Sequence, residues 1–433
     1  MIRLYLKQAW ELLKQNKLFS MLYITGTGLA IAMTMVVFVA HYIKVAPIYP
    51  ETNRARTWVL KSVSVQYLKT KGNSNWQSSY KLVRDWWYAM QETETVSAVY
   101  QPWGIEDFIQ PDNMGADIKV EVKYTDPAFF QIFQFKFLDG KPFSQADFDS
   151  GIMNAVIGES LARRIFGTTD VVGKTFNLNY TDCRVAGVVN DASFLTSSSF
   201  AQLYLPYTSV TGYDNVNGGN DDLLGSYIVY FKVKDDAQGM ALKAEVDELV
   251  RKYNASQEEK KLVLLGPDIF WKSAYRHGNA PLDWWELIRQ WGGLVLIFLL
   301  VPALNLCGMI STRMEKRLPE MGICKAFGAN RGRLLRQVLT ENLILTCLGG
   351  LLGLCLAWIV LIAGRNWVFT LFERYGDSVP EGVDTIVSFD MLFSPWVFMV
   401  GFAVCLLLNM LSALWPAWKA LRKNIVYSLN QKK

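Results

Sequence analysis

The sequence predicts a membrane protein with four transmembrane helices and a large α+β domain outside the cytoplasm. Three observations predict this fold class: four long apolar runs, a polar stretch of about 240 residues after the first run, and an uneven distribution of charge. Hydrophobic residues make up 51% of the 433-residue chain. That share is high for a soluble protein and low for a bundle of spans alone, so both parts are expected.

The four apolar runs predict spans because a helix needs roughly 20 apolar residues to cross a bilayer. The first run starts at Leu18 and continues for about 23 residues without a charge, which is longer than the core of a signal peptide. We therefore expect it to be retained as a span. The expected spans are residues 18–43, 284–312, 337–365 and 391–417.

Charge predicts the orientation of these spans. Residues 44–286 hold about 25 Lys and Arg against about 30 Asp and Glu, whereas the rest of the chain has an excess of about ten basic residues. Because basic residues mark the cytoplasmic side, we expect the loop 313–336, the tail 418–433 and the N-terminus inside. The domain 44–283 and the short loop 366–390 are then outside. No basic stripe with interleaved aromatic residues indicates nucleic-acid binding.

The basic amphipathic segment 1–17 predicts a helix that lies in the cytoplasmic membrane interface. The alternative is a soluble amphipathic helix that packs on a partner. The six cysteines are most simply small apolar packing residues, since Cys183 is alone in the large domain and no Cys/His cluster indicates a metal.

The domain 44–283 shows the order strand, helix, strand twice. The first series covers 57–67, 78–91 and 96–103, and the second covers 226–233, 237–253 and 261–265. Together the segments 44–103 and 216–283 predict a split, ferredoxin-like module. The intervening residues 104–215 predict an inserted, strand-rich subdomain. Within it, Asp126 before Pro127 predicts a capped helix start, and Gly167 predicts a left-handed helix end.

The sequence contains no cluster that predicts catalysis. Residues 328–333 lack the spacing of a phosphate loop, and the two histidines, His41 and His277, form no credible triad or metal site. An ion-driven transporter would require carboxylates inside the membrane, and the spans offer only Glu341, near a cytoplasmic end. We expect Glu341 to snorkel or to pair with a basic residue of the loop. A membrane-anchored enzyme is therefore disfavoured.

The segment 317–330 is a short amphipathic stretch between the second and third runs, with basic residues on both sides. The third run then carries a small-xxx-small pattern that favours close helix packing, at Gly349, Gly350 and Gly353. Gly26 and Gly28 in the first run suggest the same role.

These residues resemble a known family. The stretches Tyr-Thr-Asp-Pro-Ala-Phe-Phe-Gln-Ile-Phe at 124–133, Ala-Val-Ile-Gly-Glu-Ser-Leu-Ala at 155–162, Phe-Gly at 166–167 and Val-Gly-Lys at 172–174 are similar to the periplasmic core domain of MacB-type transporters. The segment 317–329, with Glu341 and the glycines after it, resembles the FtsX-like permease core. Residues 415–421 resemble the end of that core.

The resemblance implies a type VII ABC-transporter permease of the bacterial inner membrane, with a porter-like part (44–103 and 216–283) and a sabre-like part (104–215). It also implies that the cytoplasmic loop carries a coupling helix for an ABC ATPase dimer. The residues that match this helix are Glu320, Met321, Gly322, Ile323, Lys325, Ala326, Phe327, Gly328 and Ala329. Cys324 departs from the family pattern, which often has a basic residue there, and a weaker ATPase contact is the expected consequence.

The resemblance further implies mechanotransmission, in which ATP hydrolysis drives work on the periplasmic side. Because Met1 begins directly at the interfacial helix, we expect ATP and Mg to bind a separate ATPase chain, and no cofactor to bind this one. Expected partners are a second, identical or different, permease chain and a periplasmic adaptor or outer-membrane channel. The cargo would be a peptide, lipid, lipoprotein or antimicrobial compound. The alternative is an FtsX-like regulatory module that controls a periplasmic partner such as a cell-wall hydrolase.

Overall fold

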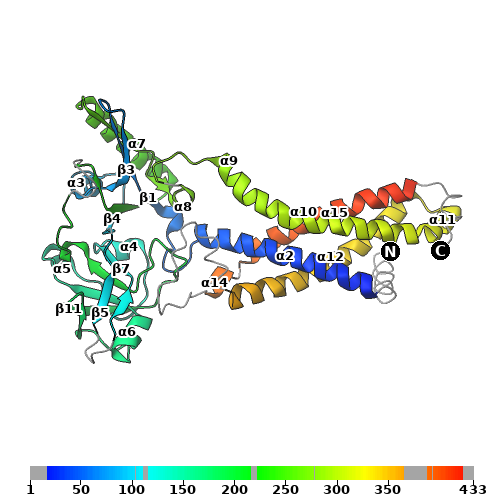
Figure 1. The fold of residues 1–433 in the computed structure, drawn as a ribbon, viewed down its shortest axis with the longest axis horizontal. Helices are drawn as coiled ribbons and strands as arrows, with labels where there is room; N and C mark the ends of the chain where they lie inside the picture. The colour runs from blue at the N-terminus through cyan, green and yellow to red at the C-terminus, as the bar shows by residue number, and fades with distance from the viewer. Residues whose placement is uncertain are drawn as a thin grey trace. The chain divides into compact units, whose positions relative to one another are not determined.

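The computed structural model describes residues 17–102, 104–110, 116–215, 222–276, 278–364, 388–392 and 394–422. Nearly all of the expected interfacial helix 1–17, most of the loop 366–390 and much of the tail 418–433 lie outside these residues. The chain divides into two compact units: a helical unit of residues 1–42, 283–372 and 387–433, and an α+β unit of residues 43–282 and 373–386. Figure 1 shows the elements of each unit.

Long helices dominate the helical unit. They are α2 (Lys17–Val45), α10 (Gly293–Lys316), α12 (Arg331–Ala363) and α15 (Pro395–Arg422), with the shorter α9 (Trp284–Leu287), a π-helix (Ile288–Gly292), α11 (Leu318–Ala326) and α14 (Phe389–Leu392). Helix α15 packs against both α10 and α12. Within the described residues, three stretches are long and apolar enough to cross a membrane: Ser20–Val45, Arg331–Ala363 and Pro395–Lys419. The other expected span, 284–312, is helical throughout, and its passage across the membrane stays a prediction.

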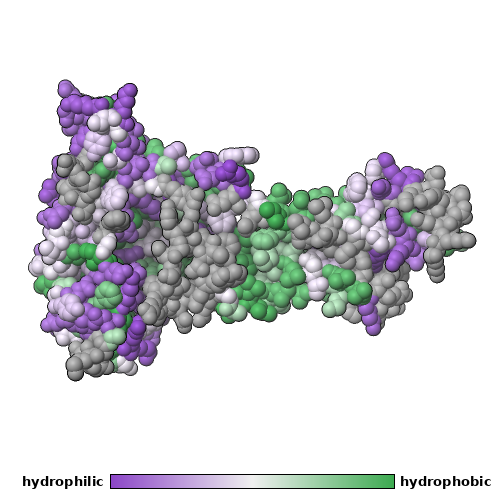
Figure 2. Space-filling model, viewed as in Figure 1, coloured by the Kyte–Doolittle hydropathy of each residue, from purple (hydrophilic) through white to green (hydrophobic). Residues whose placement is uncertain are grey.

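The outer surface of these helices is apolar, as Figure 2 shows. Leu351 on α12 is 63% exposed and Leu407 on α15 is 61% exposed. Large exposed apolar surfaces are unusual on a soluble monomer but are normal where lipid is the solvent. The surface therefore agrees with a membrane-embedded unit.

Glycines bring three of the helices into close contact. A Cβ on Gly353 of α12 would lie 2.6 Å from the carbonyl oxygen of Gly28 on α2, and one on Gly349 would lie 2.9 Å from Cβ of Thr27. A Cβ on Gly350 would lie 2.2 Å from the ring of Phe402 on α15. Helix α12 is therefore packed between α2 and α15 at a distance that only glycine permits.

Replacing Gly353 with valine should destabilise the helical unit by about 1–3 kcal/mol, because the new side chain must displace the backbone of α2. Gly26→Val is a matched control, since no described atom lies within 4 Å of a Cβ at Gly26. The measurement is the free energy of unfolding of the full chain in a sodium dodecyl sulfate titration. Equal losses in both variants would contradict the close packing.

The α+β unit is organised around one extended network of paired strands. Its strands are β1 (Thr57–Leu60), β2 (Val63–Tyr67), β3 (Asn73–Ser78), β4 (Thr95–Tyr100), β5 (Asp107–Gln110), β6 (Ile118–Val120), β7 (Val122–Thr125), β8 (Phe137–Gly140), β9 (Asn154–Gly158), β10 (Thr175–Leu178), β11 (Thr181–Val189), β12 (Leu203–Pro206), β13 (Leu224–Gly225), β14 (Tyr227–Lys232), β15 (Lys260–Val263) and β16 (Asp268–Ile269). Its helices are α3 (Tyr80–Asp85), α4 (Phe129–Ile132), α5 (Gln145–Asp149), α6 (Glu159–Phe166), α7 (Asp236–Ala255) and α8 (Phe270–Tyr275), with short 3-10 turns at Arg54–Arg56, Trp87–Ala89 and Tyr207–Ser209.

Strand β14 joins the two distant segments that the sequence assigned to one module. It pairs antiparallel with β1 on one side, where Val59 lies opposite Tyr230, and with β4 on the other, where Ala98 lies opposite Val229. The helices α3 and α7 follow the predicted strand-helix-strand order. The insertion contains β5 to β12, with parallel pairs between β7 and β12 and between β9 and β11. This confirms an α+β domain with a mixed sheet.

Some of the predicted helix ends and strands agree with the structure, and others differ from it. Gly167 ends α6 with φ of 73°, as predicted, and the side chain of Asp126 accepts a hydrogen bond from the N–H of Phe129 at 3.0 Å. The predicted strand 57–67 is wrong as a single element, because the chain breaks at Lys61 and Ser62 and the two halves pair with different strands. Strand β3, which is rich in Asn, Ser and Gln, has no apolar alternation and was missed.

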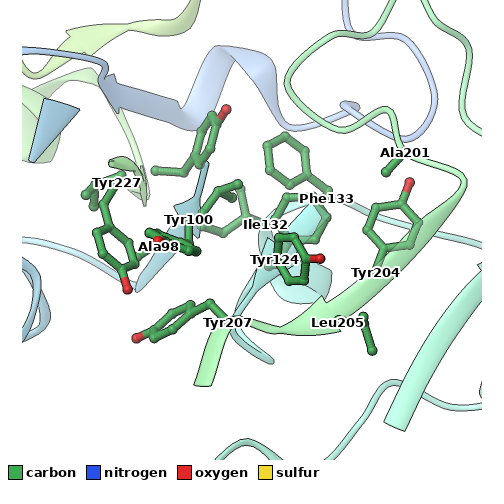
Figure 3. Close-up of a cluster of buried hydrophobic side chains, with 14 of the residues drawn as sticks. Ala98, Tyr100, Tyr124, Ile132, Phe133, Ala201, Tyr204, Leu205, Tyr207 and Tyr227 are labelled. Carbon is green, nitrogen blue, oxygen red and sulfur yellow. The ribbon is translucent and has the colours of Figure 1, made fainter. Parts of the chain in front are cut away.

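The insertion and the module share one buried aromatic core. Figure 3 shows Tyr100 and Tyr227 of the module in the same buried cluster as Tyr124, Tyr204 and Tyr207 of the insertion. The ring centroids of Tyr207 and Tyr227 are 5.3 Å apart. Because buried aromatic pairs contribute beyond their area, this contact stabilises the packing of the two segments against each other. Their division into two subdomains stays a prediction.

Candidate functional site

The candidate site is α11, the short helix in the basic loop between α10 and α12. Arg317 interrupts the long helix, with φ of −95° and ψ of 1°, and Pro319 and Glu320 then lie in the first turn of α11. Both residue types suit a helix start, since proline needs no N–H partner there and a carboxylate complements the helix dipole. Lys325 is in the last turn, and Gly328 follows with φ of 85° as a left-handed stop.

Helix α11 has one buried and one exposed face. Leu318 and Met321 are 1% and 6% exposed, and they pack in a cluster with Tyr23, Ile310 and Val338. Ile323 and Phe327 lie one turn apart and are 50% and 87% exposed. An apolar pair so exposed on a basic loop is the kind of surface that a partner protein covers.

The predicted coupling residues therefore divide into two groups. Met321 and Gly322 are buried and hold the helix in place. The exposed or half-buried residues, which alone are accessible to a partner, are Glu320, Ile323, Lys325, Ala326, Phe327, Gly328 and Ala329. Burial lowers the pKa of Lys325, and the positive charge of Arg331 adds to this shift.

An ionic cluster fixes α11 to its neighbours. Nη1 of Arg317 donates to Oε2 of Glu341 on α12 at 2.7 Å, and Nη2 of Arg313 on α10 lies 3.6 Å from the same oxygen. Glu341 is only 3% exposed. A buried carboxylate needs such partners, because an unpaired charge would lose its hydration without compensation. The expected pairing of Glu341 with a basic loop residue is confirmed.

A second polar contact connects α2 to the same region. The hydroxyl groups of Tyr23 on α2 and Thr346 on α12 are 3.3 Å apart, and Thr346 is fully buried. Tyr23 also belongs to the apolar cluster around Met321. Helix α11 and its surroundings are therefore held by side chains from α2, α10 and α12 together.

Glu341→Gln should destabilise the helical unit by about 3 kcal/mol or more, because it leaves Arg317 and Arg313 without their buried counter-charge. Glu320→Gln is the matched control: Glu320 also faces Arg317, at 3.4 Å, but its side chain is 69% exposed. That pair should contribute less than about 1 kcal/mol. The free energy of unfolding in detergent measures the loss of stability in each variant. Similar losses for Glu341→Gln and Glu320→Gln would contradict a larger contribution of the buried pair.

A further buried ion pair anchors the C-terminal end of α2 in the α+β unit. Arg54 binds Glu51 with Nε at 2.7 Å from Oε2, and its Nη1 donates to the carbonyl oxygens of Ile43 and Ala46. Glu51 in turn accepts bonds from N–H and Oγ of Ser199, both at 2.8 Å. Helix ends expose unpaired carbonyl groups, so Arg54 caps α2 and ties it to the loop around Ser199.

Lys123 holds the same loop from the other side. Its Nζ donates to the carbonyl oxygens of Ser198 at 2.7 Å and Ser197 at 3.2 Å. Burial lowers the pKa of Lys123 to about 8, although the carboxylates of Glu51 and Glu121 act in the opposite direction. A cation is therefore kept inside the domain at a cost in stability.

The low pKa of Lys123 predicts a pH-dependent stability. Between pH about 8 and 10.5 the unfolded chain binds this proton and the folded chain does not, so stability should rise with pH across that window. Lys123→Met should lack this rise, whereas Lys234→Met, at an exposed position, should keep it. Melting temperatures of the full chain in detergent from pH 7 to 10 measure the difference; parallel profiles for all three proteins would refute the assignment.

Sequence reasoning missed Glu51, Arg54 and Lys123. The i, i+3 spacing of Glu51 and Arg54 just after the first span is a weak signal for a capping pair, but nothing local indicates Ser199 as their partner. Lys123 lies in strand β7 and has no sequence signal for burial. Of the two histidines, His41 packs edge-on against Trp291, with the ring centroids 4.0 Å apart, and His277 lies outside the described residues.

Metal or catalytic chemistry finds no support in the described part of the chain. No group of three or more His, Cys, Asp or Glu side chains there could hold a metal ion. The candidate site is a loop helix with one accessible face, held by buried contacts. Apolar helices with an α+β domain inserted after α2 define the class of membrane proteins that carry a large polar domain.

Comparison with known proteins gives the family. The model of the MacB-like periplasmic core domain matches residues 20–249, and that of the FtsX-like permease C-terminal domain matches residues 292–425. The chain belongs to the MacB/FtsX-type permease family. It is a membrane protein that carries a periplasmic core domain of the MacB type, as the sequence predicted.

Individual relatives are distant. The macrolide export ATP-binding/permease protein MacB of Pasteurella multocida is 25% identical over 72% of this chain and 43% of its own length. The uncharacterized ABC transporter permease YknZ of Bacillus subtilis is 23% identical over 52% of this chain and 53% of its own. The chain thus spans about half the length of these relatives. The periplasmic region of MacB from Actinobacillus actinomycetemcomitans matches 47% of this chain and 88% of that structure, with 17% identity and a TM-score of 0.33.

Proposed function

We propose that this chain is the permease subunit of an ABC transporter that couples ATP hydrolysis on a separate ATPase chain to conformational work outside the cytoplasm. The observation that carries the proposal is the construction of α11, whose Ile323 and Phe327 are exposed while Arg317 and Met321 lock it to the spans. The family supports it, since one relative is named as an ATP-binding/permease protein. The segments matched here are core and permease domains.

The proposed coupling surface consists of Glu320, Ile323, Lys325, Ala326, Phe327, Gly328 and Ala329. An ATPase dimer, loaded with ATP and Mg, would close against this surface and displace α11. Because Glu341 links α11 to α12, the displacement would pass into a helix of 33 residues, which is about 50 Å long. Gly349, Gly350 and Gly353 would carry it on to α2 and α15.

The work would be done in the extracytoplasmic domain. The capping of α2 by Arg54 and the anchoring of Glu51 to Ser199 mean that a movement of the end of α2 must move the loop around Ser199 as well. These contacts support a proposal of mechanotransmission, in which cargo is handled outside without passing through the bilayer.

In the complete proposal, the protein has four spans, both of its termini lie in the cytoplasm, and it is located in the bacterial inner membrane. A second permease chain, identical or different, completes the transporter, with a periplasmic adaptor or outer-membrane channel as a further partner. The cargo class is a peptide, lipid, lipoprotein or antimicrobial compound. In the regulatory alternative, the same helices would pass the movement to a periplasmic enzyme such as a cell-wall hydrolase.

Site-specific photo-crosslinking tests the coupling surface. A benzophenone amino acid in place of Phe327 should crosslink, in native membranes, to a polypeptide that mass spectrometry identifies by its nucleotide-binding motifs. The same probe in place of Tyr180, which is 83% exposed in the α+β unit, should not capture that polypeptide. Phe327→Asp should reduce the ATPase activity of the purified complex at least tenfold. Crosslinking of the ATPase only from position 180, or full activity of Phe327→Asp, would overturn the proposal.

A further inference from the structure

Basic side chains without an ionic partner flank α11 along the chain. Arg313 and Arg317 of the same region pair with Glu341, but no ion pair joins a further set of basic residues to the described part of the chain. The members of this set are exposed, and they lie at the end of α10 or in the first two turns of α12. They are Lys316, Arg331, Arg333 and Arg336.

Few exposed carboxylates oppose these charges. Between residues 313 and 336 the exposed acidic residues are Glu315 and Glu320, and Glu320 already faces Arg317 at 3.4 Å. Figure 2 shows hydrophilic residues gathered at the end of the helical unit where α11 lies. This surface therefore carries an excess of positive charge.

Arg331 and Arg333 also oppose the dipole of α12. The side chain of Asn330 caps this helix and accepts a hydrogen bond from the N–H of Gly332 at 3.4 Å. The first turn contains no acidic residue. Because the N-terminus of a helix carries a partial positive charge, carboxylates are favourable there and arginines are not. A negatively charged partner would compensate both the dipole and the two arginines.

The exposed apolar pair of α11 lies beside this charge. Burial lowers the pKa of Lys325, and the positive charge of Arg331 lowers it further, so Arg331 is close to the last turn of α11. Phe327 directly follows that turn and is 87% exposed. Protein interfaces commonly combine an aromatic residue at the centre with a polar rim. Phe327 and the arginines have this arrangement.

The length of α12 favours a protein over lipid headgroups as the partner. Residues 343–363 contain no charged side chain and form about 30 Å of helix, which matches the core of a bilayer. From Leu343 back to Arg331 the same helix continues for about 18 Å. Headgroups occupy only about 5–8 Å on each side of the core. Arg331 and Arg333 therefore extend into water, beyond the headgroups.

We propose that the partner of α11 presents an apolar pocket for Phe327, with carboxylates at its rim that pair with Arg331 and Arg333. This inference rests on the proposed function, in which the partner is the ATPase chain. It adds the start of α12 to the coupling surface and assigns a negative charge to the opposing surface of the ATPase. Attraction between the opposite charges would also speed the association of the two chains.

A benzophenone amino acid in place of Arg333 identifies the partner at this position. In native membranes it should crosslink to the same ATPase polypeptide that the probe in place of Phe327 captures. Crosslinking to lipid alone, as identified by mass spectrometry, would assign the arginine to headgroups and overturn the inference. Capture of the ATPase at position 327 and of no polypeptide at position 333 would overturn this inference and leave the proposed function intact. Capture at neither position would overturn both.

Charge reversal tests the chemistry of the contact. Arg331→Glu and Arg333→Glu should each weaken binding of the captured ATPase chain about tenfold at low salt, because each replaces an attraction with a repulsion. Arg333→Lys keeps the charge and should keep most of the affinity. Arg164→Glu, at an exposed arginine of α6, is the matched control and should bind as the unmodified chain does. Surface plasmon resonance with the full chain in detergent measures these affinities.

Salt supplies a second measurement. Exposed charges are screened as ionic strength rises, since the Debye length falls from about 10 Å at 0.1 M to about 3 Å at 1 M. The association rate of the unmodified chain should fall about tenfold over this range, and that of Arg331→Glu and Arg333→Glu much less. Unchanged affinity in both reversal variants, or the same salt dependence in all chains, would refute an acidic surface on the partner.

Discussion

The burial of Glu341 is the constraint on which the packing around α11 depends. Its carboxylate is 3% exposed and lies between Arg317 and Arg313. Separating such a pair leaves buried charges without hydration, so breaking the contact costs about 3–5 kcal/mol. Helices α10, α11 and α12 are therefore joined through this one carboxylate. A coupling element needs this property, since a loosely attached helix would absorb the movement instead of passing it on.

The same physical solution recurs where α2 joins the α+β unit. Arg54 and Glu51 are both buried, and each also binds backbone groups that would otherwise be unpaired. The helical packing between these two ends also excludes larger side chains, because the backbones at Gly28 and Gly353 are in close contact. Buried charge and close backbone contact thus produce stiffness in two different ways. Both trade stability that an apolar contact might supply for a defined geometry.

Patterns of neighbouring residues made much of the fold predictable. Apolar runs located the long helices, and Gly167 marked the end of α6 correctly. The predicted helix start at Asp126 and Pro127 was too early, because α4 begins at Phe129 with Ala128 as its N-cap. The break of 57–67 into β1 and β2 could not be seen, because both halves are strands and only their partners differ. The prediction that α11 carries the coupling site stays a prediction, and it did not separate the outward and inward faces of this helix: Met321 and Gly322 are buried.

The sequence by itself determined the class of protein, the loop that carries the candidate site and the glycines that pack α12. These follow from composition and short spacings, which local physics controls. Only the tertiary structure decided which residues hold the ends of the helices. Glu341 meets Arg317 across 24 residues, and Ser199 meets Glu51 across 148. Such pairs depend on how the chain returns to itself, and a charged residue has the same appearance in a sequence whether it is buried or in water.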